Sequence, residues 1–87
     1  MDFEYDPTKS ALNLSKHGID FDQAQALWDD PWVLEAPAKT VDEPRFLLIG
    51  KIEDKHWAVI WTPRGEAVRI ISARRARKEE IEFYESN

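Results

Sequence analysis

The sequence contains no cysteine, and this absence removes two classes of protein. Neither a disulfide-linked scaffold nor a thiolate metal site can form without cysteine, which fits a reducing compartment. Two histidines and scattered aspartates do not form a ligand cluster at metal-site spacing, so we expect no metal and no cofactor. No apolar run approaches the roughly 20 residues that span a bilayer. The first residues, MDFEYD, have neither the basic charge nor the apolar stretch of a secretion signal, and we expect a cytoplasmic protein.

The chain does contain enough apolar surface for one small core. Its 87 residues are 43% hydrophobic and include four tryptophans, four phenylalanines and two tyrosines. This composition argues against disorder, and the length leaves no room for a second domain. We expect a single domain over residues 1–87, with a stability of about 3–5 kcal/mol.

Charge is distributed unevenly along the chain, whose net charge is −5. Residues 1–43 carry a net charge of −7, residues 44–78 carry +6, and residues 79–87 add four acids. Five of the twelve basic residues lie within the stretch RIISARRARK at positions 69–78. This segregation predicts two surfaces of opposite sign, one for a polyanion and one for a basic partner, although an unevenly charged solvated surface explains it equally well.

The N-terminal segment predicts a short helix over residues 7–17. Asp6 followed by Pro7 is typical of an N-cap with proline at the first helical position. Gly18, which follows a lysine and a histidine, is typical of the residue just after a helix ends.

A second helix and a loop are predicted to follow. Asp20 and Gln23 form a capping-box pattern, and apolar residues at helical spacing extend this helix to Pro31. Three prolines then interrupt the stretch at residues 29–44, which predicts a loop with a short edge strand at Trp32–Glu35.

The second half of the chain predicts strands and then a helix. The runs RFLLIGKI, HWAVIWT and AVRIISA are separated by short turns and predict a meander of three antiparallel strands. In the middle strand Trp57, Val59 and Trp61 point to one face, which helices must cover. A helix is predicted over residues 76–85. The expected fold class is therefore α+β: helices packed on one face of a small antiparallel sheet, with the other face partly open.

Four basic residues lie where the last predicted strand ends and the last helix begins, and we call them the basic junction: Arg74, Arg75, Arg77 and Lys78. We expect their side chains to converge on a phosphate, because the arginine guanidinium matches two phosphate oxygens and the helix start adds positive partial charge. Arg64 and Arg69 are candidates to extend this phosphate-binding surface. The alternative is that the arginines form ion pairs with Glu79, Glu80 or the acidic N-terminal half.

Three stretches of the sequence resemble the BrnT family of toxins in order and spacing: FEYDPTKSALNLSKHGIDFDQAQALWDDP, RFLLIG and VRIISARRARKEEIEFYE. The resemblance depends most on Asn13, Lys16-His17-Gly18, Phe21 and Ile71-Ser72-Ala73-Arg74 in that order. It implies a RelE-like fold and a toxin that cleaves RNA and inhibits translation. It also implies neutralisation by a BrnA antitoxin with a ribbon-helix-helix domain, in a dimer or heterotetramer that binds operator DNA through the antitoxin.

RNA cleavage without a metal needs specific chemical groups, and the sequence can be searched for residues that supply them. The ribose 2′-hydroxyl attacks the neighbouring phosphate, so the protein must orient the chain, neutralise charge and move two protons. We expect Arg74 and Arg75 to neutralise the charge. The candidates for proton transfer are Glu79, Tyr84, and His17 or His56.

Each of these proton-transfer candidates has a competing structural role. His17 suits the C-terminal cap of the first helix, and His56 is expected at a hairpin edge, exposed and without a role. Glu79 can form an ion pair with an arginine one turn earlier, and Tyr84 can belong to the apolar stripe of its helix. Among the aromatics, Trp57 and Trp61 are expected in the core, not as base-stacking platforms, while the other two tryptophans suit a core or an interface.

Two alternatives to a ribonuclease remain. The first is a binding module of the same fold that lacks activity and serves as the antitoxin's partner or co-repressor. The second is a regulator that grips nucleic-acid phosphates without chemistry, for which the basic junction would suffice.

Overall fold

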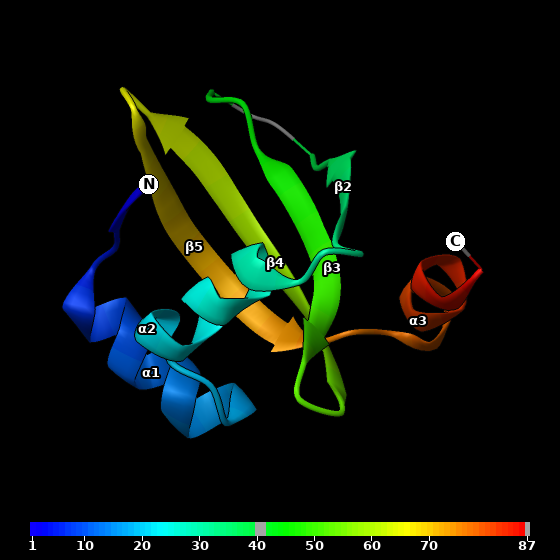
Figure 1. The fold of residues 1–87 in the computed structure, drawn as a ribbon. Helices are drawn as coiled ribbons and strands as arrows, with labels where there is room; N and C mark the ends of the chain where they lie inside the picture. Colours follow the sequence, from blue (N-terminus) through cyan, green and yellow to red (C-terminus); the bar gives the residue numbers. More distant parts are fainter. Residues whose placement is uncertain (40–41, 87) are drawn as a thin grey trace.

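The structure is a computed structural model that describes residues 1–39 and 42–86. Its architecture is α+β, with a five-stranded mixed sheet in the order β1-β5-β4-β3-β2 (Figure 1). The elements are β1 (Asp2–Glu4), α1 (Pro7–His17), α2 (Phe21–Ala24), the 3₁₀ helix η1 (Gln25–Asp29), β2 (Leu34–Pro37), β3 (Phe46–Ile52), β4 (Lys55–Arg64), β5 (Ala67–Arg75) and α3 (Lys78–Glu85). None of the helices in this part of the chain is long and apolar enough to cross a membrane.

Helix α1 forms over the predicted residues, with the predicted caps. The Asp6 side chain accepts hydrogen bonds from the backbone N–H groups of Thr8 and Lys9. At the other end Gly18 adopts a φ of 80°, a left-handed conformation that glycine reaches without steric cost, and its N–H donates to the Leu14 carbonyl.

The predicted second helix is shorter than expected. The capping box at Asp20 and Gln23 is confirmed, but the α-helix ends at Ala24 and continues as η1 instead of running to Pro31 as one α-helix. In η1 the buried residue is Leu27, three positions after the buried Ala24, a spacing that the three residues per turn of a 3₁₀ helix accommodate.

The predicted meander of β3, β4 and β5 is confirmed, with antiparallel pairing of β3 to β4 and of β4 to β5. The predicted edge strand also exists but begins two residues later, as β2 at Leu34–Pro37, antiparallel to β3. Of the loop predicted across residues 29–44, positions 40 and 41 lie outside the described residues.

The sheet is larger than the predicted three-stranded meander with a short edge strand, and it is mixed, not purely antiparallel. Strand β1, which was not predicted, pairs in parallel with β5, with Phe3 opposite Val68. Three residues are too few to show a strand periodicity, and a partner more than 60 residues away leaves no local signal.

The hydrophobic core lies between the N-terminal helices and one face of the sheet. Trp57 and Val59 are buried there and Trp61 packs against them, as the alternation along β4 predicts. Trp28 contacts both Phe3 and Trp61 edge-on, at ring-centroid distances of 5.1 and 6.1 Å. Three of the four tryptophans therefore help to join the N-terminal segment to the sheet.

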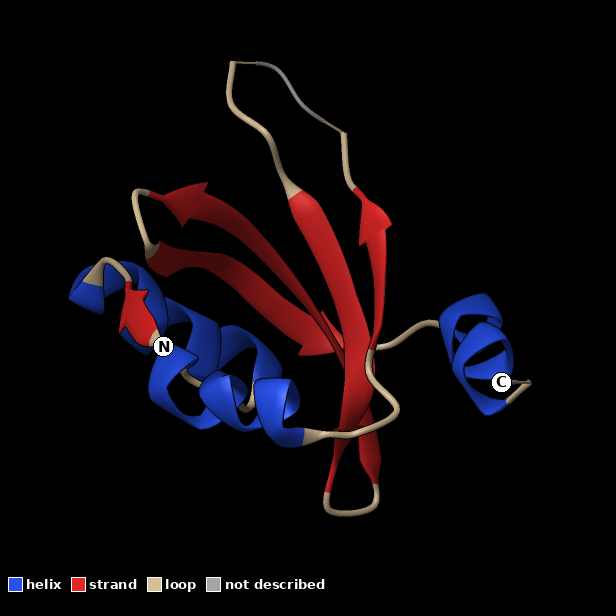
Figure 2. Cartoon of the chain, turned by 45° about the horizontal axis from the view of Figure 1, so that its top comes forward, coloured by secondary structure: helices blue, strands red, loops and turns tan. Residues whose placement is uncertain are grey.

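Helix α3 corrects the prediction that all helices cover one face. Figure 2 shows α3 across the sheet from the N-terminal helices. Its residue Tyr84 is buried and its ring contacts His56, which alternates with Trp57 along β4 and so lies on the other face. The helix begins at Lys78, two residues later than predicted.

Asn13 joins α1 to the end of β5. Its buried amide nitrogen donates to the carbonyls of Ile19 and Ala73, each at 2.8 Å, and its oxygen accepts the Ala73 N–H at 3.3 Å. One side chain thus forms hydrogen bonds with the backbone of both the α1–α2 connection and β5. This fixes the strand that leads into the basic junction.

Candidate functional site

The first two arginines of the basic junction point to opposite faces of the sheet. Arg74 lies on the α3 side, where its two terminal nitrogens donate to the Glu80 carboxylate at 2.8 and 3.0 Å. Arg75 lies on the α1 side, with its guanidinium carbon 5.4 Å from the ring centroid of Trp57. Neighbouring residues of a strand alternate between faces, so the predicted convergence of Arg74 and Arg75 on one phosphate is wrong.

The ion pair between Arg74 and Glu80 agrees with the alternative prediction, in which the arginines of the basic junction pair with acidic residues of the chain. The two side chains are only 26% and 15% exposed. The hydrogen bond from Arg74 outweighs burial and lowers the pKa of Glu80 below its ordinary value of 4.5. Glu80 also accepts the Arg77 N–H at 2.8 Å, so one carboxylate caps α3 and holds it to β5. The charge of Arg74 is neutralised within the chain.

The other predicted site residues do not form one cluster. Three are exposed at the start of α3: Arg77, Lys78 and Glu79. Arg69 pairs with Glu4 at 3.0 Å and Arg64 with Glu43 at 3.8 Å, and both arginines line a separate hollow of about 210 Å³. Six residues of β4, roughly 20 Å, separate Arg64 from the position opposite Arg74. Arg64 therefore does not extend the basic junction.

The two histidines lie in different surroundings. His17 is exposed in the last turn of α1, on the side of the sheet opposite α3. The side chain of His56 is only 15% exposed, and its Nε2 lies 2.7 Å from the Glu85 carboxylate. Its ring contacts that of Tyr84 edge-on at 5.3 Å. The expectation that His56 is exposed is wrong, because α3 folds over it.

Tyr84 is held by a carboxylate from the other half of the chain. Its hydroxyl donates to Asp30 at 2.7 Å, and burial, followed by the charge and hydrogen bond of Asp30, raises the pKa of Tyr84 to about 12. Asp30 also accepts the N–H groups of Trp32 and Lys51, at 2.9 and 2.8 Å. Burial would raise the pKa of Asp30, but these hydrogen bonds outweigh it and the pKa is lowered. Asp30 is thus an ionised anchor for α3, β3 and the Trp32 loop.

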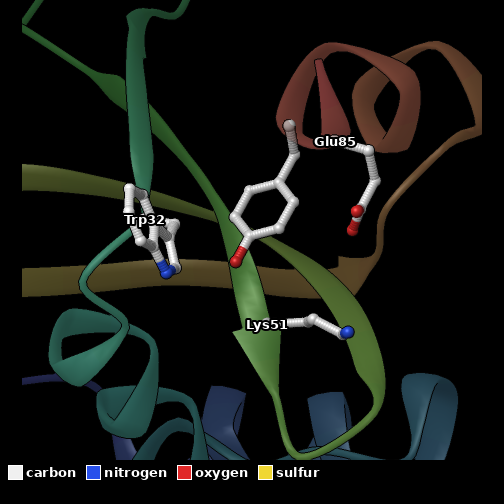
Figure 3. A pocket seen from close by; sticks show the side chains of 4 residues that line it. Trp32, Lys51 and Glu85 are labelled. Carbon is white, nitrogen blue, oxygen red and sulfur yellow. The ribbon is translucent and has the colours of Figure 1, made fainter. Parts of the chain in front are cut away.

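These contacts surround a hollow of about 310 Å³, which we call the α3 pocket and which is lined by Trp32, Lys51, Tyr84 and Glu85. In Figure 3 the side chains of Lys51, from β3, and Glu85, from α3, lie on the same side of the view, and Trp32 lies apart from them. Within residues 1–39 and 42–86, no group of three or more His, Cys, Asp or Glu side chains is placed to hold a metal ion.

Sequence reasoning missed most of the α3 pocket. Tyr84 was a candidate, but the pairing of His56 with Glu85 joins residues 29 positions apart, and that of Tyr84 with Asp30 joins residues 54 apart. Periodicity carries no information on such pairs. One signal was available: adjacent positions in a strand cannot share a face, which already separates Arg74 from Arg75.

The α3 pocket is lined by a carboxylate, a tyrosine, a cation and an exposed indole, and its carboxylate is paired with a histidine. RNA-binding and RNA-cleaving proteins use groups of these kinds. Residues 5–80 match the model of a family described as the ribonuclease toxin, BrnT, of type II toxin–antitoxin systems. The match covers most of the chain, which therefore belongs to this family, as the sequence motifs predicted. A toxin of this type has an antitoxin partner. No curated protein matches the chain.

Proposed function

We propose that the protein is a metal-independent endoribonuclease with a RelE-like fold, the toxin of a type II pair, which inhibits translation and is neutralised by a BrnA-like antitoxin. The observation that supports this most is the pairing of His56 with Glu85 at 2.7 Å, beside Tyr84; Glu85 and Tyr84 both line the α3 pocket. A histidine oriented by a carboxylate is suited to proton transfer near neutral pH.

In the proposed reaction His56 takes the proton of the ribose 2′-hydroxyl, which attacks the adjacent phosphorus. Glu85 orients the imidazole through the contact of its carboxylate with Nε2. Tyr84 keeps its proton at neutral pH because its pKa is about 12. In the proposed reaction its hydroxyl turns from Asp30, to which it donates in the structure, and gives the proton to the departing 5′-oxygen. The P–O5′ bond breaks as the 2′-oxygen bond forms, leaving a 2′,3′-cyclic phosphate and a 5′-hydroxyl.

Positive charge for the RNA backbone comes from two places in this proposal. Lys51 contributes from the α3 pocket, and Arg77 and Lys78 contribute from the exposed start of α3. Arg75 lies on the opposite face of the sheet, over Trp57. Arg74 contributes indirectly, because its bond to Glu80 positions α3 over His56. His17 and Glu79 have no contact with the α3 pocket among the described residues.

A cleavage assay that compares the two histidines tests this proposal. Purified His56→Ala and His17→Ala proteins, checked for folding by circular dichroism, are incubated with RNA in the presence of a metal chelator. Loss of a proton-transfer group should slow cleavage by about 10²- to 10⁴-fold in His56→Ala, with cyclic phosphate ends in the wild-type products. Equal activity of wild type and His56→Ala, or a loss confined to His17→Ala, would refute the assignment.

A second candidate function is the non-catalytic antitoxin partner. The full pairing of Arg74 with Glu80 favours it, since this arginine was expected to contact phosphate. If this candidate is correct, wild-type protein binds its antitoxin but leaves RNA intact and does not arrest growth when expressed.

A further inference from the structure

Trp32 differs from the other three tryptophans of the chain. It is 68% exposed, whereas Trp28, Trp57 and Trp61 belong to the core or pack against it. A single exposed apolar side chain is common and by itself indicates nothing. The surroundings of Trp32 are what give it meaning, because it lines the α3 pocket opposite charged residues.

The backbone that carries the Trp32 indole is fixed in place. Asp30 accepts the Trp32 N–H through Oδ1, while its Oδ2 accepts from the backbone of Lys51 and from the Tyr84 hydroxyl. The next residue, Val33, donates its N–H to the Asp30 carbonyl at 3.2 Å. The loop is thereby tied to the groups of the α3 pocket, so a ligand binds without first having to order it.

Lys51 is the cation of the α3 pocket and suits a phosphate. Glu85, which also lines the pocket, is paired with His56 through its Oε2. An indole surface and a cation in one binding site are a combination with which proteins bind unpaired nucleotides, by stacking on the base and neutralising the backbone.

We propose that the α3 pocket binds one unpaired nucleotide of single-stranded RNA, with its base stacked on Trp32 and its phosphate beside Lys51. This inference deepens the proposed function and rests on it for the identity of the substrate. It makes Trp32 a substrate-positioning residue and makes single-stranded RNA, not duplex RNA, the substrate class. A base inside a duplex is already stacked on its neighbours and cannot reach the indole.

Binding is measured first, by fluorescence anisotropy with a labelled 2′-O-methyl oligoribonucleotide, which cannot be cleaved because its nucleophile is blocked. Removing an aromatic stacking partner typically weakens binding by about 5- to 150-fold, so we expect Trp32→Ala to bind at least about fivefold more weakly. Trp32→Phe should recover most of the affinity. Leu12→Ala is the matched control, since Leu12 is 63% exposed but lies on α1, and its affinity should equal that of wild type.

Cleavage by the same variants separates this inference from the proposed function. With a cleavable single strand, Trp32→Ala should raise KM and leave kcat nearly unchanged, as expected for a group that binds substrate and transition state equally. Wild-type affinity of Trp32→Ala, or equal binding of duplex and single strand, overturns the inference even if RNA is cleaved. Weaker binding by Trp32→Ala in a protein that never cleaves RNA supports the inference and overturns the proposed nuclease. If Trp32→Ala loses antitoxin binding but not RNA binding, the indole belongs to a protein interface and the inference fails.

Discussion

Replacing Glu80 with glutamine tests how firmly α3 is held against the sheet. The change keeps the shape of the side chain and an oxygen for the Arg77 N–H, but it removes the charge that Arg74 contacts through two hydrogen bonds. Exposed ion pairs contribute roughly 0.2–1 kcal/mol. Breaking a fully buried pair costs roughly 3–5 kcal/mol. Because both side chains are partly buried, we expect Glu80→Gln to lower the free energy of unfolding by about 2 kcal/mol.

The measurement is urea denaturation of Glu80→Gln, Arg74→Met and the double variant, which gives the coupling energy between the two side chains. Glu79→Gln, one residue away and exposed, is the control and should change stability by less than about 0.5 kcal/mol. A coupling energy below about 0.5 kcal/mol would show that the ion pair does not hold α3, and the argument from its geometry would be wrong.

The pH dependence of the stability difference between wild type and Glu80→Gln gives an independent test. Since the hydrogen bond from Arg74 lowers the pKa of Glu80, the folded state releases this proton more readily than the unfolded state. The stabilisation is therefore present above the ordinary pKa of 4.5 and is lost as the pH falls through the lower pKa of the folded state. The stability difference between wild type and Glu80→Gln should shrink below about pH 4.5, and a constant difference would contradict this.

Two further substitutions test the packing that positions the site. Asn13→Ala leaves buried backbone groups, including the N–H and the carbonyl of Ala73, without their hydrogen-bond partner, at a cost of roughly 1–3 kcal/mol each. Thermal denaturation should therefore show a protein near or below the limit of stable folding. An unchanged unfolding midpoint would disprove the role of Asn13. Gly50→Ala places a methyl group 2.9 Å from Leu27 and 3.0 Å from the Asp30 carboxylate. Urea denaturation should show that the free energy of unfolding falls by roughly 1–3 kcal/mol, and an unchanged value would contradict this close packing.

The parts of the fold that local chemistry determines could be predicted from the sequence. The caps of α1 depend on Asp6 and Gly18, which act within one helical turn, and the three central strands depend on an alternation that is visible along each strand. The core position of Trp57 follows from the same alternation. Each of these signals lies within a few residues of the feature that it predicts.

The parts that were missed depend on partners distant in the chain. Strand β1 exists only because β5 offers it an edge, and the side of the sheet that α3 covers is set by its bonds to Arg74, His56 and Asp30. In the candidate site, too, local features could be predicted and distant partners could not. The basic junction was recognised by composition, but composition does not say that Arg74 already has a partner.

Strand β5 also sets the order in which the chain can fold during its own synthesis. Helix α1 has 11 residues, too few to be stable alone in water. The Ala73 carbonyl of β5, to which the Asn13 amide donates, lies 60 positions further along the chain. At about 5–20 residues per second, a ribosome needs roughly 3–12 seconds to synthesise that interval. The first helix therefore spends this time without its docking partner, and the mature arrangement closes only as the final core strand emerges.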